Sequence, residues 1–547
     1  MTETLESPPG RALPALAAAL AERGFWLAVG AVAGAVAAFV GHQLMAFPPH
    51  EDETLALFVG RDSLAGVVEH VTRERGGAPL HFLVAWAVAH AGLGLEGLRA
   101  ASALFAVGSV PLVALLGLRL ADRRTALLAT VLAAGSWALL FHGVYGRMYS
   151  LFLLTALLAW LALLRALERP AAAAWALWAL AVLACVGTHP YGLLVLGGQA
   201  AFVLLARRDR LRQAAAAFAA VAVAGIPFWL TDLVLAGRFG VGVGGRGQRL
   251  GDPASVADYL WRTAGDFTAG WWPATAGVLA LAAVGLLSVR RETLLLAVAV
   301  VGVPALAFLA AQIGPTASPE TRHLLFALPV LTLLVAAGLV RVTRRAPALA
   351  PVLAAALVTA EVAWAWERTP SLFEWEPAAR VAARAQAGAY LASVTRPGDV
   401  LFGYEPLWLD AWERAESFPR TVLPRADARL ALRELRRARR GRPLGHGVWV
   451  LDASETTNAS ASPRVEPRAP APTARFRVRA FGPFLVLRTR APTRTPARYL
   501  AAAARVQLLG RSLGIGDANV NLATIERAER ERRGYASSER SLSISSR

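Results

Sequence analysis

Long apolar stretches, separated by short arginine-rich loops, recur through the first two thirds of this 547-residue chain. The stretch 25–46, for example, would form a helix about 33 Å long at about 1.5 Å per residue, enough to cross the hydrocarbon core of a bilayer. With 56% hydrophobic and 17% charged residues, the chain is too apolar for an ordinary soluble protein. The pattern predicts a polytopic membrane protein. Its first segment is predicted to be a retained anchor, because it has no A-x-A-like cleavage site.

Eleven segments are predicted to span the membrane. Five short loops between them hold 14 arginines and 4 acids, whereas the loops at the opposite ends hold 9 arginines and 12 acids. By the positive-inside rule, the arginine-rich loops are cytoplasmic. This predicts a cytoplasmic N-terminal segment (1–24), an outer loop (47–96) and, because the number of spans is odd, a C-terminal part outside. The predicted spans are 25–46, 97–118, 125–142, 149–164, 171–187, 190–206, 213–231, 273–289, 293–312, 323–340 and 346–366.

One apolar stretch of the outer loop is not counted as a span. The stretch "PLHFLVAWAVAHAGL" (79–93) has only 15 residues, and a crossing there would move every later arginine-rich loop outside. We predict a juxtamembrane helix along the outer surface.

The character of the chain changes after residue 366. Short strand-like runs, among them "GVWVLD" (447–452), flank a charged helical stretch (425–440). This order predicts a small extracytoplasmic α/β domain over 367–491. Residues 492–547 are predicted to be a basic, partly disordered tail with one amphipathic stretch at 498–513.

The composition excludes several kinds of chemistry. All 57 basic residues are arginine, which rules out Schiff-base and P-loop lysine mechanisms and is typical of a GC-rich bacterial genome. The single cysteine, Cys185, allows no internal disulfide and no cysteine-based metal site. Because arginines beside membrane spans account for the net charge of +19, we predict no nucleic-acid partner.

The stretch "PPHEDETLALF" (48–58) places consecutive acids where the first predicted span ends. Acids are costly inside a bilayer, so those at the mouth of a span are either solvated or catalytic. Asp52 or Thr54 as the N-cap of a following helix is the structural interpretation, and a catalytic carboxylate is the other. His50 and Asp52, with Glu51 between them, are also candidate ligands of a divalent metal.

Several segments, in order, resemble membrane glycosyltransferases of the GT-C class. The nearest are bacterial family-39 enzymes, which include protein O-mannosyltransferases and the aminoarabinose transferases that modify lipid A. The resemblance covers roughly residues 25–366 and implies an all-α membrane domain of the GT-C fold over that range. It is carried by "PPHEDETLALF", "GGAPLHFLVAW" (76–86), the segment around "GRMYSLFLL" (146–154), "THPYGLLVL" (188–196) and "ETRHLLFALPVLTLLVAAGL" (320–339).

The resemblance implies transfer of a sugar, mannose or another hexose or pentose, from a polyprenyl-phosphate donor to an acceptor hydroxyl on the extracytoplasmic face. The acceptor is a glycan, a lipid or a protein, and the anomeric centre is inverted. Asp52 would be the general base, and Glu53 would orient the loop or the acceptor. The residues implied to bind the donor phosphate or the substrate are Arg147, Tyr149, His189, Tyr191, Arg322 and His323.

Two features leave other interpretations open. The family's second acid after the third span is absent from "GRMYS", which puts a two-carboxylate site in doubt. A multi-pass transporter or flippase of a lipid-linked envelope precursor is the main alternative, and a non-catalytic scaffold is another. Nearly all charges lie at span ends rather than at the midplane, which favours the transferase. The expected location is the bacterial plasma membrane.

Overall fold

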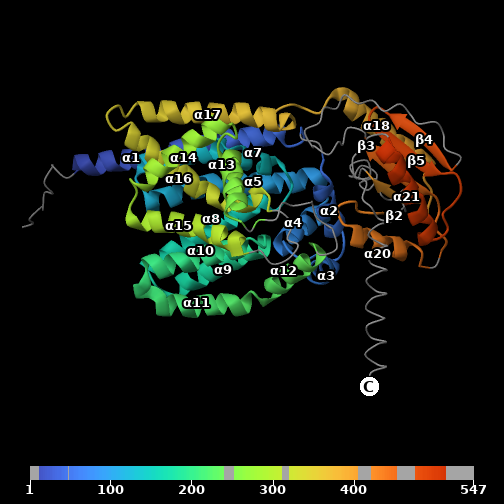
Figure 1. The fold of residues 1–547 in the computed structure, drawn as a ribbon, viewed down its shortest axis with the longest axis horizontal. Helices are drawn as coiled ribbons and strands as arrows, with labels where there is room; N and C mark the ends of the chain where they lie inside the picture. Colours follow the sequence, from blue (N-terminus) through green and yellow to red (C-terminus); the bar gives the residue numbers. More distant parts are fainter. Residues whose placement is uncertain are drawn as a thin grey trace, which may run out of the picture.

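The computed structural model describes residues 12–46, 49–239, 250, 252–310, 319–403, 421–440, 442–452 and 475–512. A bundle of long helices is followed by a smaller domain with a β-sheet, and the two lie side by side along the longest axis (Figure 1). The short helices α2, α3 and α4 lie at the end of the bundle that faces this smaller domain (Figure 1). The predicted class, an all-α membrane domain with a small C-terminal α/β domain, is therefore confirmed in outline.

Each of the eleven predicted spans coincides with helix. Six helices of the described chain are long and apolar enough to cross a bilayer, or nine spans if each of three bent pairs counts as one, while α9 and α10 are shorter apolar helices. The count of eleven thus stays a prediction. The helices of the bundle are α1 (Ala12–Gln43), α5 (Gly94–Leu120), α6 (Arg123–Gly135), α7 (Trp137–Val144), α8 (Tyr149–Glu168), α9 (Ala172–Thr188), α10 (Gly192–Ala206), η2 (Arg208–Arg210), α11 (Leu211–Ala224), α12 (Ile226–Phe239), α13 (Pro253–Phe267), α14 (Trp272–Leu286), α15 (Arg291–Ala310), η3 (Thr321–Ala327), α16 (Leu328–Val342), α17 (Leu349–Arg368) and η4 (Pro370–Leu372).

The breaks inside the predicted spans 125–142 and 213–231 were not predicted, whereas the third break lies just before the predicted span 273–289. The bends measure 52° between α6 and α7, 58° between α11 and α12 and 94° between α13 and α14. At the first break, the backbone of Ser136 is extended, and the freed N–H of Trp137 donates to the buried Glu361 carboxylate at 2.6 Å. A break inside an apolar bundle is stable only where such a partner satisfies the backbone.

The outer loop folds into four short helices, α2 (Glu51–Gly60), α3 (Leu64–Glu69), the π-helix η1 (His70–Arg75) and α4 (Pro79–His90). A helix at 79–93 is therefore confirmed, and its place on the membrane surface stays a prediction. Phe82 and Ala85 of α4 pack against Leu55 and Val59 of α2 in one apolar cluster. Gly76 has a positive φ of 71°, and a β-carbon there would lie 2.2 Å from the Thr231 carbonyl of α12, so only glycine fits this turn.

The C-terminal domain has a five-stranded sheet in the order β2-β1-β3-β5-β4. Strand β1 is parallel to β2 and β3, whereas β5 is antiparallel to β3 and β4. Helix α18 covers one face, and α20 with α21 covers the other. The elements are α18 (Ala378–Val394), β1 (Val400–Gly403), β2 (Thr421–Val422), α20 (Ala428–Ala438), β3 (Gly447–Asp452), β4 (Phe476–Phe481), β5 (Phe484–Thr489) and α21 (Pro496–Ser512).

One predicted boundary is wrong. The α/β domain does not end at residue 491, because Tyr499 and Val506 of α21 are buried in the sheet core. Helix α1 begins at Ala12, but its part that is long and apolar enough to cross a bilayer is Ala21–Gln43, close to the predicted span 25–46. The cytoplasmic location of 1–24 stays a prediction. The predicted disorder of the tail beyond Ser512 lies outside the described residues.

Candidate active site

The acidic stretch forms the first turn of α2. His50 is the N-cap, and its Nδ1 accepts the N–H of Asp52 at 3.2 Å, while the Glu53 carboxylate accepts the N–H of His50 at 2.9 Å. This reciprocal pair satisfies two backbone donors that a helix start leaves open. The interpretation of Asp52 or Thr54 as the N-cap is therefore wrong, because the helix begins at Glu51.

Each acid of this turn is paired with an arginine from a different part of the molecule. The helix dipole already favours acidic side chains in a first turn. The three ion pairs in addition attach this turn to three other parts of the molecule. The turn is thus held to α5, to the segment between α7 and α8, and to the C-terminal domain. The pairs are Glu53 with Arg99 at 2.8 Å, Asp52 with Arg147 at 2.6 Å and Glu51 with Arg425 at 2.7 Å.

Glu53 is fully buried and makes a structural ion pair. Its two carboxylate oxygens accept from Nε and Nη2 of Arg99, both at 2.8 Å, and one also accepts the N–H of Gly146 at 2.7 Å. A β-carbon at Gly146 would lie 3.0 Å from that oxygen, so glycine permits the close approach. With no exposed surface on its side chain, Glu53 fits the orientation of the loop, and not contact with an acceptor.

Asp52 keeps 23% of its side chain exposed, and its partner Arg147 keeps 10%. Burial alone would raise the pKa of Asp52, but the positive charge of Arg147, with smaller contributions from His50, Arg75 and Arg322, holds this pKa well below its usual value. Asp52 is therefore ionised at neutral pH. Asp52 is thus a charged carboxylate that remains partly accessible in the first turn of α2.

The six residues predicted to bind donor or substrate lie together. Arg147 and Arg322 lie 6.0 and 5.0 Å from the ring centre of Tyr149, so two cations share one aromatic neighbour. Residues far apart in the sequence thus form one cationic and aromatic cluster next to Asp52, in which Arg147, Tyr149 and His189 are buried and the other three are partly buried. The ring centre of His323 lies 4.9 Å from the ring centre of Tyr191, 5.1 Å from that of His189 and 6.2 Å from that of Tyr149.

The two histidines of this cluster carry their proton on Nε2. Nδ1 of His189 accepts the N–H of Tyr191 at 3.1 Å, and Nδ1 of His323 accepts the N–H of Glu320 at 3.1 Å. Burial, with the nearby charges of Arg147 and Arg322, also lowers the pKa of His189 to about 3. The hydrogen-bond network thus assigns the neutral tautomer that donates from Nε2, and two ring N–H groups become available to an anion.

Three residues near the site were not found from the sequence. His142 is buried with its ring centre 4.7 Å from Tyr149, and neither of its ring nitrogens has a hydrogen-bond partner among the described residues. The hydroxyl of Tyr145 lies 2.8 Å from Nδ1 of His50. His142, Tyr145 and Tyr149 follow one another at intervals of three and four residues. This spacing was the feature of the sequence that could have indicated that the three side chains lie close together. Nothing in the local sequence marked Arg99, because its partner lies 46 residues away.

The residues suggested for a divalent metal do not fit one. Asp52 is paired with Arg147, and Nδ1 of His50 already accepts a backbone N–H. Across the part of the chain that the structure describes, no three side chains of His, Cys, Asp or Glu gather as a metal site.

No family profile matches the sequence, and no curated protein matches it. Several solved structures match the chain, among them two of one protein and one of another. Apo ArnT from Cupriavidus metallidurans matches with a TM-score of 0.50 at 16% identity, over 86% of this chain and 98% of that one. ArnT bound to undecaprenyl phosphate matches with a TM-score of 0.52 at 13% identity, over 85% and 98%. The arabinofuranosyltransferase AftD from Mycobacteria matches with a TM-score of 0.45 at 15% identity, over 85% of this chain and 40% of that one. The likeness to ArnT shows that the chain has the fold of the GT-C class of membrane glycosyltransferases.

Proposed function

We propose that this protein is an inverting membrane glycosyltransferase that moves a sugar from a polyprenyl-phosphate donor to an acceptor hydroxyl, with Asp52 as the general base. The observation that carries the proposal is the pair of Asp52 and Arg147. It joins an ionised, accessible carboxylate to a cation that also lies against the cluster around Tyr149.

The cluster suits the phosphate of the donor. Arg147 and Arg322 provide positive charge, and His189 and His323 provide N–H groups. Arg147 and His189 are buried, whereas Arg322 keeps 24% of its side chain exposed. Preorganised donors of this kind stabilise the charge that develops on a leaving phosphate, and a planar guanidinium binds it through two oxygens. The likeness to ArnT, one structure of which is bound to undecaprenyl phosphate, supports a polyprenyl phosphate as the carrier.

The reaction needs one proton acceptor and one leaving group. The acceptor oxygen forms a bond to the anomeric carbon from the face opposite the phosphate, the bond from that carbon to the phosphate oxygen breaks, and the acceptor proton passes to Asp52. Polyprenyl phosphate leaves with the electron pair, and attack from the opposite face inverts the anomeric centre.

Arg147 would serve both halves of this reaction. Without donor, its guanidinium contacts Asp52 at 2.6 Å and keeps that carboxylate a weak base. A phosphate in the cluster would draw part of this guanidinium to itself and so raise the basicity of Asp52 when the donor is in place. Glu53 then acts as a positioning residue through its fully buried pair with Arg99.

Topology and substrates complete the proposal. The site would face the outside of a bacterial plasma membrane, with the N-terminus in the cytoplasm and the C-terminal domain outside. The sugar would be mannose or another hexose or pentose, and the acceptor a glycan, a lipid or a protein. Membrane lipids would surround the bundle. A transporter or flippase gains little support from Glu361, the buried acid within α17, because its bond to Trp137 accounts for it structurally.

The test is sugar transfer by membranes that contain wild type, Asp52→Asn or Asp258→Asn. They would be supplied with labelled polyprenyl-phosphate mannose and a native envelope extract. Asp258 is a matched control, because it is an exposed acid of α13 whose partner, Arg262, lies on the same helix. Loss of the base should lower the rate by about 10²–10⁴-fold at equal expression, and the control should keep wild-type activity. Equal labelling by wild type and Asp52→Asn would remove Asp52 from the catalytic role.

A further inference from the structure

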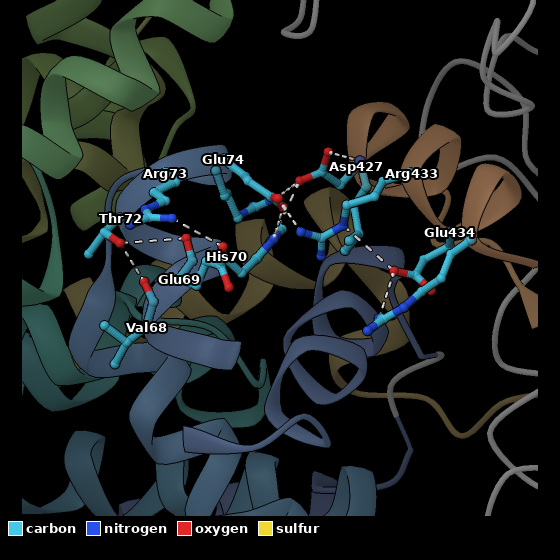
Figure 2. Close-up of polar contacts among 12 residues, drawn as sticks. Val68, Glu69, His70, Thr72, Arg73, Glu74, Asp427, Arg433 and Glu434 are labelled. Atoms are coloured by element: carbon cyan, nitrogen blue, oxygen red, sulfur yellow. Dashed lines mark hydrogen bonds and ion pairs between the residues drawn. The ribbon is translucent and has the colours of Figure 1, made fainter. Parts of the chain in front are cut away.

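The C-terminal domain contacts the outer loop through the segment 425–433, which includes the first turns of α20. Leu430 is buried in the apolar cluster of the outer-loop helices, beside residues such as Leu55 and Val71. Figure 2 shows the polar part of this contact, in which Asp427 and Arg433 face His70 and Glu74 of η1. The cross-domain ion pairs are Arg425 with Glu51 at 2.7 Å, Asp427 with Arg75 at 3.4 Å and Arg433 with Glu74.

One charge in each of two of these pairs is buried. The side chains of Arg425 and Asp427 are 4% and 2% exposed, whereas their partners Glu51 and Arg75 are 30% and 15% exposed. Asp427 also caps α20, since its carboxylate accepts the N–H of Leu430 at 3.1 Å, so the docking segment is rigid where it meets the loop. Buried pairs are screened little by salt, and loss of one partner leaves a charge uncompensated.

The segment also holds the η1 side of the contact in place. Nδ1 of His70 lies 2.9 Å from Glu74, and Nε2 of the same ring lies 4.0 Å from Asp427. Burial alone would raise the pKa of Glu74, but His70 and Arg433 together lower it, so Glu74 is charged at neutral pH. The short helix η1 therefore docks through charged groups that match those of α20.

Two of the cross-domain pairs act on the surroundings of Asp52. Glu51 precedes Asp52 in the first turn of α2, so the pair with Arg425 fixes the turn on which Asp52 lies. Arg75 is one of the cations whose charge acts on Asp52, and it is held by Asp427. The two domains thus meet at the carboxylate proposed as the base.

We propose that the C-terminal domain is a working part of the catalytic centre, in which Arg425, acting through Glu51, positions the turn of α2 that bears Asp52. The catalytic part of this proposal rests on the proposed function. Its structural part, that Arg425 holds the turn in place, rests on the fold alone. Arg425 is a positioning residue, so its loss slows the chemical step and leaves binding of the donor in the cluster around Tyr149 unchanged.

The experiment compares full-length wild type with Arg425→Ala, Arg425→Lys and Arg437→Ala in detergent. Arg437 is the matched control, because it is an arginine of α20, the helix that follows Arg425, is 64% exposed and pairs with Glu434 of the same helix. Hydrogen exchange is followed in the peptide 49–60, whose first amides, those of Glu53 and Thr54, donate to the His50 carbonyl. In parallel, kcat and KM for labelled polyprenyl-phosphate sugar are measured.

In Arg425→Ala we expect about tenfold faster exchange of these amides, because the turn opens more often without its attachment. The same variant should lose about 10- to 100-fold in kcat through a small misplacement of the base, with KM for the donor within about twofold. Arg425→Lys should recover most of both, and Arg437→Ala should match wild type.

Unchanged exchange in Arg425→Ala would overturn the proposal, whatever the activity. Faster exchange with wild-type kcat would overturn it as well, since the attachment would then have no catalytic role. If wild type transfers no sugar from any lipid-linked donor, the proposed function fails, and the exchange data still decide whether the C-terminal domain holds the turn.

Discussion

Replacement of Arg99 by methionine tests whether the buried pair with Glu53 holds the site together. Both side chains have no exposed surface, and the guanidinium donates two bonds of 2.8 Å to the carboxylate and a third of 3.0 Å to the Leu44 carbonyl at the end of α1. Methionine has a similar reach but neither the charge nor the donors. Glu53 would keep only the N–H groups of Gly146 and His50. Removal of one partner from a buried pair costs about 3–5 kcal/mol.

The assay is thermal unfolding of the purified protein in one detergent, beside an exposed pair of the same chemistry. Arg262→Met removes the partner of Asp258 in α13, where the two side chains are 49% and 54% exposed, so this change should cost no more than about 0.5 kcal/mol. At about 1 °C per kcal/mol for a chain of 547 residues, Arg99→Met should melt about 3–5 °C below wild type and Arg262→Met within about 1 °C. Equal melting temperatures for the two variants would refute the reasoning, because burial would then add nothing to the pair.

Two further predictions concern the ionisation of Asp52 and the core of the C-terminal domain. The pKa of Asp52 lies below its ordinary value of about 3.9, so the stability from its ionisation is present above that value and is lost only as the pH falls through the folded pKa. Arg147→Met removes the main charge that lowers this pKa, so burial raises the pKa of Asp52 in the variant. When transfer is measured from pH 8 to pH 5, the rate of the variant should therefore fall toward pH 5, whereas the rate of wild type should not. Identical pH profiles would contradict this. Tyr499→Ala should destabilise the C-terminal domain by about 3–4 kcal/mol, because the ring is fully buried and stacked on Trp449 at 4.9 Å. Leu508→Ala, at a residue 65% exposed on the same helix, should change proteolysis of the domain little, and equal sensitivity of the two variants would place α21 outside the core.

The helices and their order could be predicted because bilayer thickness and hydrophobicity are local properties of the sequence. The breaks inside the bent pairs could not, since the break at Ser136 depends on the buried acceptor Glu361, 225 positions away in α17. The domain boundary at 491 was wrong for a related reason. The amphipathic stretch predicted at 498–513 forms helix α21, but the sheet that its buried face covers could not be recognised from that stretch alone.

For the site, the sequence by itself determined which residue types stand where: acids at the end of the first apolar segment, and Arg147, His189 and Arg322 at the ends of later ones. Their order carried the resemblance to the GT-C class. Only the tertiary structure decided the surroundings of these acids. Glu51, Asp52 and Glu53 are adjacent in the sequence, yet Glu51 pairs with the C-terminal domain, Asp52 lies partly exposed beside the cationic cluster and Glu53 is fully buried. The physical reason is that burial and charged partners come from other parts of the chain, and neither is encoded in the local sequence.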